Sequence, residues 1–451
     1  MKKAPNDKIN SDHVDWFRAS APYIHTHRGS TFVILFGGES VDHPGFAHLI
    51  NDIALLGSLG VRLVLVHGAR PQIEKQLQHL GLESSFADEL RITTAENMPG
   101  VEQAVGQVRM AIEAQLSRGL PNTPMAGAAI RVVSGNFITA QPYGVRNGID
   151  FCQTGNVRRV DAEAIASQLE QKNVVLISPI GYSLTGETFN LRAEDIATET
   201  AIALEADKLI FIMENNGVTD KDGQLLQQLD INQAEQWQKN HGKKNKQSND
   251  ENRLTQALLN KAAHACRSGV NRTHMISQNI DGALLLELYS RDGVGTLVSA
   301  DNYEGLRTAT IDDIGGIMEL IAPLEEKGVL VKRSREQLEL DIKYFTVIER
   351  DSMIIGCAAL FLFPEEKAAE LACLAVHPDY QQQGRGNDLM EHIEWQARKQ
   401  HITELFTLTT QTTHWFLERG FSEVPVEKLP MQKQSLYNYQ RKSKILYHAL
   451  S

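Results

Sequence analysis

Cysteine is scarce in this sequence of 451 residues, which has only four, at positions 152, 266, 357 and 373. Their spacing matches no metal-binding pattern and is too sparse for a disulfide framework. We therefore expect reduced thiols, a cytoplasmic location and no metal.

Long apolar runs are also missing. No stretch approaches the ~18 residues that a membrane-spanning helix needs, and the N-terminal residues lack the apolar segment of a signal peptide.

Positively charged residues are fewer than negatively charged ones: 45 Lys and Arg against 56 Asp and Glu give a net charge of −11. Binding to phosphate backbones requires a basic surface, so nucleic acid is not the expected partner. A membrane is not expected either.

What the sequence does contain is the pattern of an α/β protein. Apolar segments at 31–40, 62–71, 173–181 and 208–217 are separated by helical patterns such as 162–170. Fully apolar strands that alternate with helices are typical of a mainly parallel sheet covered on both faces. This pattern predicts a domain over residues 21–300, preceded by an N-terminal arm or helix over residues 1–20.

One segment of this domain, 232–253, is almost wholly polar and rich in Asn, Gln and Lys. Such a composition favours a mobile surface loop. A lysine-rich loop for an anionic ligand is the alternative.

The pattern changes at a short linker, 301–307, and a second domain is predicted over residues 308–451. A strand and a helix are followed by an antiparallel-type hairpin at 345–363, and further strands and helices come after it. This order predicts an α+β domain.

The strongest motif of the second domain lies where an apolar strand gives way to a helix, at Gln381-x-x-Gly384-x-Gly386. Glycines let the backbone approach a ligand closely, and the free N–H groups at a helix start attract a pyrophosphate. By itself this motif could also be an ordinary surface turn.

Together with Trp415–Phe421 (WFLERGF), the motif resembles the GNAT acetyltransferase family over residues 308–451. The resemblance implies acetyl-CoA as co-substrate, with its pyrophosphate at the Gln-Gly loop and its thioester carbonyl at backbone N–H groups of 374–376. The contacts with acetyl-CoA implied in this way are Leu374, Ala375, Val376, Gln381, Gln382, Gln383, Gly384, Arg385, Gly386 and Asn387.

Acetyl transfer to an amine also requires a general base and a general acid. Glu370 begins the strand that leads to the loop, and the resemblance makes it the expected base, although a carboxylate at a strand end is often simply solvated. Strict alternation places Glu370 and Leu374 on one face of the strand and Cys373 on the other. Many members have a tyrosine acid where this chain has Phe416, which cannot donate a proton. We therefore expect Thr409 to be the acid, with Tyr437 and Tyr439 behind it.

The first domain resembles the amino-acid kinase family, in particular acetylglutamate kinases, through FGGES, VHGARPQI, SPIGYSLTGETFNLRAEDIATETA and DGALLLELYSRDGVGTLV. These segments follow the family's order over most of the domain. The residues for phosphoryl transfer are nevertheless replaced. Leu35 stands where those kinases have a lysine, His67–Arg70 departs from the usual triple-glycine turn, and Glu214–Asn215 replaces a Thr-Asp pair. Since phosphoryl transfer needs cationic counter-charge, we expect a kinase fold without kinase activity.

A kinase-like domain followed by a GNAT domain resembles the N-acetylglutamate synthase family over essentially the whole chain. The resemblance implies the reaction of acetyl-CoA with L-glutamate to give N-acetyl-L-glutamate and CoA, the first step of arginine biosynthesis. A substrate with two carboxylates calls for cationic partners. The glutamate-binding residues implied by the resemblance are Lys332, Arg333, Cys373, Arg441 and Ser443, each of which could otherwise be an ordinary surface or core residue.

A kinase-like domain without kinase chemistry suggests regulation. Arginine-inhibited acetylglutamate kinases bind arginine through a His, a Glu thirteen residues later and a Gly six residues beyond, and His274, Glu287 and Gly293 have this spacing. The resemblance therefore implies feedback inhibition by L-arginine, a distal effect exerted through a change of state. It also implies a homo-oligomer, with a hexamer formed through the N-terminal helix.

Three alternatives remain open at this point. A true or bifunctional acetylglutamate kinase is disfavoured by Leu35, and a non-enzymatic sensor is disfavoured by Glu370 and the intact loop. An acetyltransferase for another amine is disfavoured by the acidic chain and the kinase-like domain.

Overall fold

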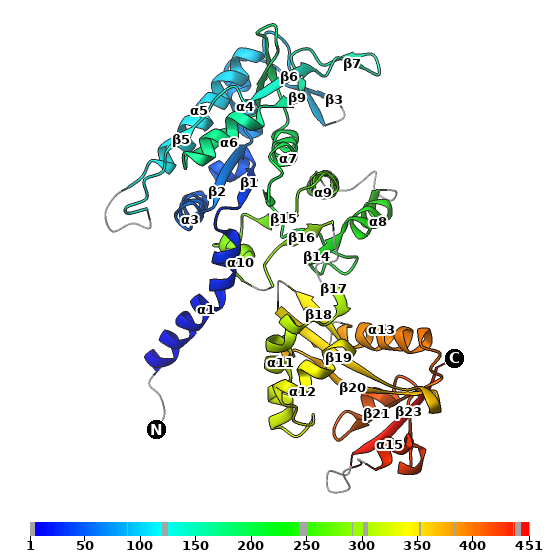
Figure 1. Cartoon of the computed structure of the whole chain (residues 1–451). Helices are drawn as coiled ribbons and strands as arrows, with labels where there is room; N and C mark the ends of the chain where they lie inside the picture. The colour runs from blue at the N-terminus through cyan, green and yellow to red at the C-terminus, as the bar shows by residue number, and fades with distance from the viewer. Residues whose placement is uncertain are drawn as a thin grey trace. The chain divides into compact units, whose positions relative to one another are not determined.

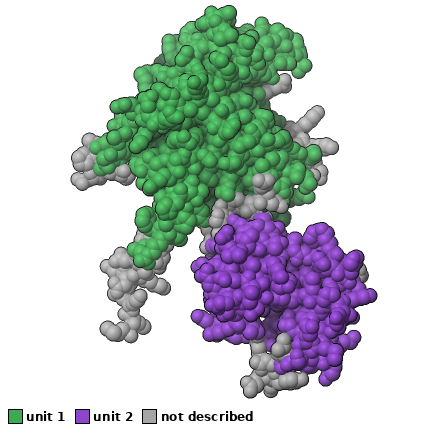
Figure 2. Space-filling view, viewed as in Figure 1, with its two compact units in different colours: residues 1–301 green, residues 302–451 purple. Residues whose placement is uncertain are grey.

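The computed structural model describes residues 5–87, 89–119, 125–242, 250–290, 292–300, 305–350, 353–381, 384–435, 437 and 443–450. The chain divides into two compact units, residues 1–301 and 302–451, coloured green and purple in Figure 2. Of the helices in the described ranges, none combines the length and the apolar character required to cross a bilayer.

The first unit is built on an eight-stranded sheet that is mainly parallel; only β15 and β16 pair antiparallel (Figure 1). In spatial order its strands are β14 (Gln228–Asp230), β16 (Thr296–Ser299), β15 (Arg272–Ser277), β13 (Lys208–Met213), β1 (Thr31–Phe36), β2 (Arg62–His67), β10 (Val174–Ile177) and β5 (Val132–Val133).

Helices cover both faces of this sheet, as the apolar strands predict. In β1, Phe32 and Ile34 pack into one core with α3 (Phe46–Ser58) and α5 (Met98–Leu116). Val33 and Leu35 pack into the opposite core with α7 (Ala193–Ala203) and α9 (Asp250–Arg267). Every residue of β1 is buried, and after Thr31 at its start all of them are apolar, as a strand covered on both faces requires. The predicted sheet covered on both faces is confirmed.

Smaller elements complete the unit. The remaining helices are α2 (Gly38–Asp42), α4 (Arg70–His79), α6 (Ala162–Glu170), α8 (Ile231–Gly242) and α10 (Ala283–Tyr289). A second sheet has the order β12 (Thr188–Asn190), β11 (Ile180–Tyr182), β6 (Ile138–Pro142) and β9 (Gly155–Val160), and two hairpins are formed by β3 (Ser85–Ala87) with β4 (Leu90–Ile92) and β7 (Val145–Arg146) with β8 (Ile149–Asp150).

The prediction of a loop over residues 232–253 is wrong for most of that segment, because α8 ends at Gly242 and α9 begins at Asp250. Ala234 is fully buried, and Trp237 packs against the core while its Nε1 donates a hydrogen bond to the carbonyl of Thr219 (2.8 Å). Together with Ile231 at its start, these apolar side chains hold a helix whose other residues are mostly polar. Residues 243–249 lie outside the described ranges.

The N-terminal helix α1 (Pro5–His27) is attached to α10 at its C-terminal end. Nε2 of His27 donates a hydrogen bond to the carbonyl of Leu288 (2.8 Å), and the hydroxyl of Ser20 donates to the carbonyl of Tyr289 (3.1 Å). Burial, with Lys208 adding to it, lowers the pKa of His27 to about 3, so its ring is neutral.

The second unit contains a seven-stranded sheet in which only β20 and β21 pair parallel. Its helices are α11 (Ile314–Glu326), α12 (Arg335–Asp341), α13 (Arg385–Lys399), α14 (Thr413–Leu417) and α15 (Met431–Gln434). In spatial order its strands are β17 (Gly305–Thr308), β18 (Phe345–Arg350), β19 (Met353–Phe363), β20 (Ala368–Val376), β21 (Glu404–Thr409), β23 (Lys444–Ala449) and β22 (Ser422–Val424).

Two cores again cover the two faces. Leu389 and Ile393 of α13 pack on one face, and Ile317 and Ile321 of α11 pack on the other. This antiparallel sheet with helices is the α+β domain that the sequence predicts.

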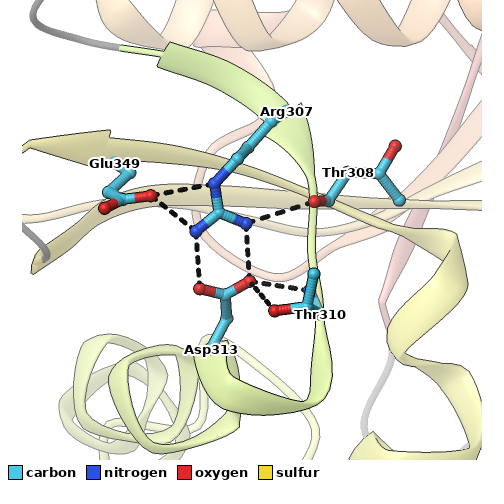
Figure 3. Close-up of polar contacts among 5 residues, drawn as sticks. All are labelled: Arg307, Thr308, Thr310, Asp313 and Glu349. Carbon is cyan, nitrogen blue, oxygen red and sulfur yellow. Dashed lines mark hydrogen bonds and ion pairs between the residues drawn. The ribbon is translucent and has the colours of Figure 1, made fainter.

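An ionic cluster fixes the start of the second unit (Figure 3). Arg307 of β17 donates two hydrogen bonds to the carboxylate of Asp313 (2.7 Å each), and its Nε donates to Glu349 of β18 (2.8 Å). The backbone N–H of Thr310 also donates to Asp313 (2.7 Å). The hydrogen bonds from Arg307 lower the pKa of Asp313 to about 2. Residues 305–307, which we expected in a linker, are therefore part of the sheet.

Candidate active site

A cavity of about 1100 Å³ opens in the sheet of the second unit, between β20 and β21. These two strands pair over three residues only, from Ala368 opposite Glu404 to Glu370 opposite Phe406. Beyond this point β20 and β21 no longer pair with each other, and side chains of 370–374 and 407–409 line the cavity. The separation leaves strand backbone available to a ligand inside the unit.

A β-bulge lies in β20 beside this cavity. Cys357 pairs with Ala375 but Ala359 pairs with Ala372, so that two residues of β20 lie opposite one residue of β19. Cys373 has φ +54° at this point. The bulge breaks the alternation: Cys373 packs in the core beneath α11, whereas Leu374 packs against the core of α13. The prediction that Leu374 shares the face of Glu370 is therefore wrong.

Glu370 lies at the last position where β20 pairs with β21 and is 7% exposed. Its Oε2 lies 2.6 Å from Nζ of Lys433, a residue of α15 that also lines the cavity. Lys433 was not among the residues expected from the sequence, since it belongs to a four-residue helix without a recognisable motif.

Arg333 and Cys373 meet at the cavity wall, where NH1 of Arg333 lies 3.2 Å from the sulfur of Cys373. The backbone N–H of Arg333 donates to Glu325 (2.9 Å). Burial raises the pKa of Cys373 to about 11, although Arg333 opposes the shift. Cys373 is thus a neutral thiol at pH 7, a contact group rather than a nucleophile.

Of the other residues expected to bind glutamate, one lines the cavity, one lies away from it, and one is outside the described residues. Ser443 is buried and lines the cavity, and its carbonyl accepts a hydrogen bond from the hydroxyl of Tyr437 (2.6 Å). Lys332 is exposed and does not line the cavity. Arg441 lies outside the described residues, as does Tyr439.

Thr409 ends β21 at the cavity wall and is 5% exposed. Its hydroxyl oxygen lies 2.8 Å from that of Thr412 and accepts a hydrogen bond from the backbone N–H of Thr412 (3.1 Å). These contacts orient the hydroxyl at the turn into α14. Phe416 also lines the cavity, so an apolar ring occupies the position of the usual tyrosine acid.

The Gln-Gly loop leads from β20 into α13. Gly384 precedes the helix with φ +87°, a conformation that favours glycine. A Cβ at Gly386 would lie 3.1 Å from the ring of Trp415, so a larger residue here requires the ring to shift. Gln381 and Gly386 line the cavity, whereas Gln382 and Gln383 lie outside the described residues.

Two side chains of this region, those of Arg385 and Asn387, contact other protein residues and do not line the cavity. Arg385 is buried, stacks over the ring of Tyr380 (4.9 Å) and donates to the carbonyl of Tyr380 (3.3 Å). The side-chain oxygen of Asn387 accepts a hydrogen bond from Arg419 (2.8 Å). The backbone N–H groups at the start of α13 stay available to a ligand.

Of the three strand residues expected at the thioester, only two have side chains at the cavity. Leu374 and Val376 line the cavity, while the Ala375 side chain is buried in the core beneath α11.

In the first unit, the three residues expected to bind arginine lie together. Nδ1 of His274 donates to Glu287 (2.7 Å), whose other oxygen accepts the N–H groups of Val294 (2.7 Å) and Gly295 (2.9 Å). Gly293 has φ +62°, and a Cβ there would collide with the Glu287 carboxylate.

The charge states of this cluster follow from its surroundings. Burial lowers the pKa of His274, and nearby Lys208 adds to the shift. Burial alone would raise the pKa of Glu287, but the hydrogen bond from His274 and those from the backbone hold it below its usual value. The pair is thus a neutral imidazole and a carboxylate, and Nε2 of His274 faces Lys208 at 3.4 Å.

The cleft where a kinase would hold phosphates is also formed, as a cavity of about 250 Å³ lined by Leu35, Gly37, Gly38, Gly68 and Ala69. A Cβ at Gly68 would lie 3.0 Å from the nitrogen of Gly38, so the two turns pack backbone against backbone. Leu35 contributes an aliphatic side chain where phosphoryl transfer needs a cation. Among the described residues, no group of three or more His, Cys, Asp or Glu side chains could hold a metal ion.

Both units match known families. The amino acid kinase family matches residues 30–277, and the acetyltransferase (GNAT) domain matches residues 341–423. An amino-acid acetyltransferase of Serratia proteamaculans (strain 568) is 51% identical over 436 residues, covering 96% of this chain and 97% of that protein. One of Escherichia coli (strain K12) is 51% identical over 433 residues with the same coverage.

Solved structures of N-acetylglutamate synthase from Neisseria gonorrhoeae are similar over the whole chain. The one with coenzyme A and L-arginine has a TM-score of 0.87 and 36% identity, covering 97% of this chain and 99% of that chain. The one with coenzyme A and N-acetyl-glutamate has a TM-score of 0.61 at the same identity and coverage.

Proposed function

This chain belongs to the amino-acid acetyltransferase family, and we propose that it transfers the acetyl group of acetyl-CoA to the α-amine of L-glutamate. The products are N-acetyl-L-glutamate and CoA. The observation that carries the proposal is a buried carboxylate, Glu370, in a large cavity that also presents Arg333. The printed descriptions of the similar synthase structures, which contain coenzyme A with N-acetyl-glutamate or L-arginine, support this choice of substrate.

Glu370 is the proposed general base. The ammonium of glutamate loses a proton to its carboxylate, and the free amine attacks the carbonyl carbon of the thioester, so that a C–N bond forms. The oxygen of that carbonyl becomes negative, and backbone N–H groups of β20 beside the bulge are its proposed hydrogen-bond donors.

The C–S bond then breaks as the carbonyl re-forms, and the departing thiolate takes up a proton. The new amide nitrogen still carries one excess proton, which it releases and which restores the proton lost by the group that protonates the thiolate. Thr409 is the proposed donor, because its hydroxyl is oriented at the cavity wall by Thr412. Tyr437, which also lines the cavity, is the second candidate.

Glutamate binding is assigned to residues of the same cavity. Arg333 pairs with one substrate carboxylate, and Ser443 contributes to the site of the other. Lys332 has no part in this proposal, since it is exposed outside the cavity. Arg441 stays a candidate partner from the sequence.

L-arginine is the proposed inhibitor, bound in the first unit. The carboxylate of Glu287 suits a guanidinium, and His274 and Gly293 adjoin it. We further propose a hexamer assembled through α1, on which Trp16 and Phe17 are exposed. Light scattering of the purified chain tests the hexamer.

The direct test is CoA-thiol release by the purified chain from acetyl-CoA and L-glutamate, with and without L-arginine. A parallel sample contains ATP, Mg²⁺ and N-acetylglutamate. The proposal requires glutamate-dependent thiol release, its suppression by arginine, and no ADP. Formation of ADP without thiol release would show that the chain is a kinase despite Leu35.

A further inference from the structure

Lys433 occupies the place next to Glu370 that a substrate ammonium needs. Its Nζ lies 2.6 Å from Oε2, and the side chain of Glu370 is only 9% exposed. Oε2 is nevertheless without a hydrogen bond of good geometry. Lys433 and Glu370 thus attract each other as charges without a well-aligned hydrogen bond. A donor with better geometry can therefore replace Lys433 at Oε2.

A general base must lie within hydrogen-bond reach of the proton that it removes. The substrate amine therefore has to approach the carboxylate that Lys433 already contacts. The side chain of Lys433 is 30% exposed, and four methylene groups give its ammonium room to move. Once displaced, this ammonium requires a new anionic partner, because a partly buried unpaired charge is costly.

The charges around the cavity indicate which substrate supplies that partner. Among the described residues that line it, Arg333, Lys433 and Glu370 are charged. Two cations and one anion give a net charge of +1, which glutamate, with two carboxylates and one ammonium, balances. Glutamine, with one carboxylate and one ammonium, does not.

We propose that Lys433 determines specificity for an acidic amino acid by exchanging partners. In the free enzyme its ammonium pairs with Glu370. When substrate binds, the substrate ammonium takes its place at Glu370, and Lys433 pairs with a substrate carboxylate. This inference rests on the proposed function, because it names how the same cavity selects its substrate.

The test compares Lys433→Met, which keeps length but removes charge, with Lys433→Arg and the wild type. Lys444→Met is the matched control, since Lys444 forms a similar ion pair with Glu423 (2.9 Å) elsewhere in the unit. For each protein, kcat and KM are measured with L-glutamate and with L-glutamine at saturating acetyl-CoA.

In Lys433→Met, the preference for glutamate over glutamine is expected to fall about 10- to 100-fold, mainly through a higher KM for glutamate. Lys433→Arg should restore part of the preference, and Lys444→Met should retain all of it. An unchanged preference in Lys433→Met, with normal circular dichroism, would overturn the proposal. An equal loss in Lys444→Met would overturn it as well.

A second measurement needs no turnover. Trace acetylation of lysines with acetic anhydride, mapped by mass spectrometry, should modify Lys433 more slowly than Lys444 and faster once Glu370 is changed to Gln. If Lys433 reacts equally fast in both proteins, the pairing is refuted. If the wild type releases no CoA with glutamate, the proposed function fails, while this labelling still reports the contact itself.

Discussion

Arg333 is held at the cavity by two contacts of different kinds. Its backbone N–H donates to Glu325, and its guanidinium lies against the sulfur of Cys373. Lys332, one position earlier, is exposed. These two neighbouring cations therefore differ in what they can bind, and each serves as a control for the other.

Arg333→Ala is expected to raise the KM for glutamate about 10- to 100-fold, because a charge-assisted pair with a carboxylate is lost. Turnover at saturation should change less, and Lys332→Ala should change neither parameter. Steady-state thiol release measures both. A higher KM in Lys332→Ala, with Arg333→Ala normal, would reverse the assignment.

Glu370→Gln is expected to lower kcat by roughly 10² to 10⁴, since the amide cannot accept the proton of the ammonium. The affinity for acetyl-CoA should be unchanged, because its proposed contacts come from β20 and the start of α13. Thiol release and calorimetric titration with acetyl-CoA measure these two effects. Glu391→Gln, on the exposed side of α13, is the control. Equal losses of turnover and affinity would rule out a role as base alone.

Part of this site is readable from the sequence. Gly384 and Gly386 are predictable, because the Gln-Gly motif stands where an apolar strand gives way to a helix. The structure adds that Gly384 has a positive φ, which favours glycine, and that a Cβ at Gly386 would lie 3.1 Å from the Trp415 ring. Glu370 is expected from the resemblance to GNAT enzymes, because its place at a strand end would by itself fit a solvated carboxylate equally well. Lys433 is not predictable, because it reaches Glu370 only through folding of the segment between β22 and β23. The face of Leu374 was mispredicted, since alternation assumes a strand without a bulge.

At the scale of elements, the cluster around Arg307 ties β17, the start of α11 and β18 together. The carboxylate of Asp313 is stabilised in its ionised form, with its pKa lowered from 3.8 to about 2. This contribution to folding is complete above the unfolded pKa near 3.8. It is lost as the pH falls through about 2.

Asp313→Asn is expected to lower the free energy of unfolding of the second unit at pH 7 by about 1 kcal/mol, allowing for solvent screening of the partly exposed Arg307. The difference from wild type should shrink as the pH falls from 4 toward 2. Urea unfolding measures it in a background where Trp16 and Trp237 are Phe, so that Trp395 and Trp415 report on this unit.

Asp312→Asn changes the exposed neighbour and is the control. A difference that stays constant over this pH range would show that the ionised carboxylate is not what stabilises the unit.

The elements themselves differ in how well they could be predicted. The central residues of β1, β2, β10 and β13 are apolar because both faces of the sheet are covered, and such runs stand out in any sequence. The helix α8 does not stand out, because Ile231, Ala234 and Trp237 are its core contacts and most of its other residues are polar. Local composition cannot reveal a core that other segments provide.

At the scale of the whole molecule, the proposed inhibition requires the effector to change the free energy of a reaction performed by another unit. Glu287 is the residue at which this can be tested, because its carboxylate accepts hydrogen bonds from His274, Val294 and Gly295. Replacing Glu287 by glutamine keeps the shape of the side chain and removes its charge, so the effect of the charge on arginine binding can be measured apart from that of packing.

Glu287→Gln is expected to reduce the affinity for L-arginine about 10- to 100-fold, since the guanidinium loses its counter-charge. Thiol release without arginine should remain near the wild-type rate. Arginine titrations of thiol release measure both, with Glu163→Gln on the exposed surface of α6 as control. An unchanged arginine response would place the effector elsewhere.

The separation of β20 from β21 has a consequence for solubility. Unpaired strand backbone normally occurs at the edge of a sheet, where it can recruit a strand of another molecule and start aggregation. Here the unpaired stretch lies between two interior strands, with β19 on one side and β23 on the other. Strand-like hydrogen bonds are thus available to a small molecule that enters the cavity, while a neighbouring polypeptide is kept out.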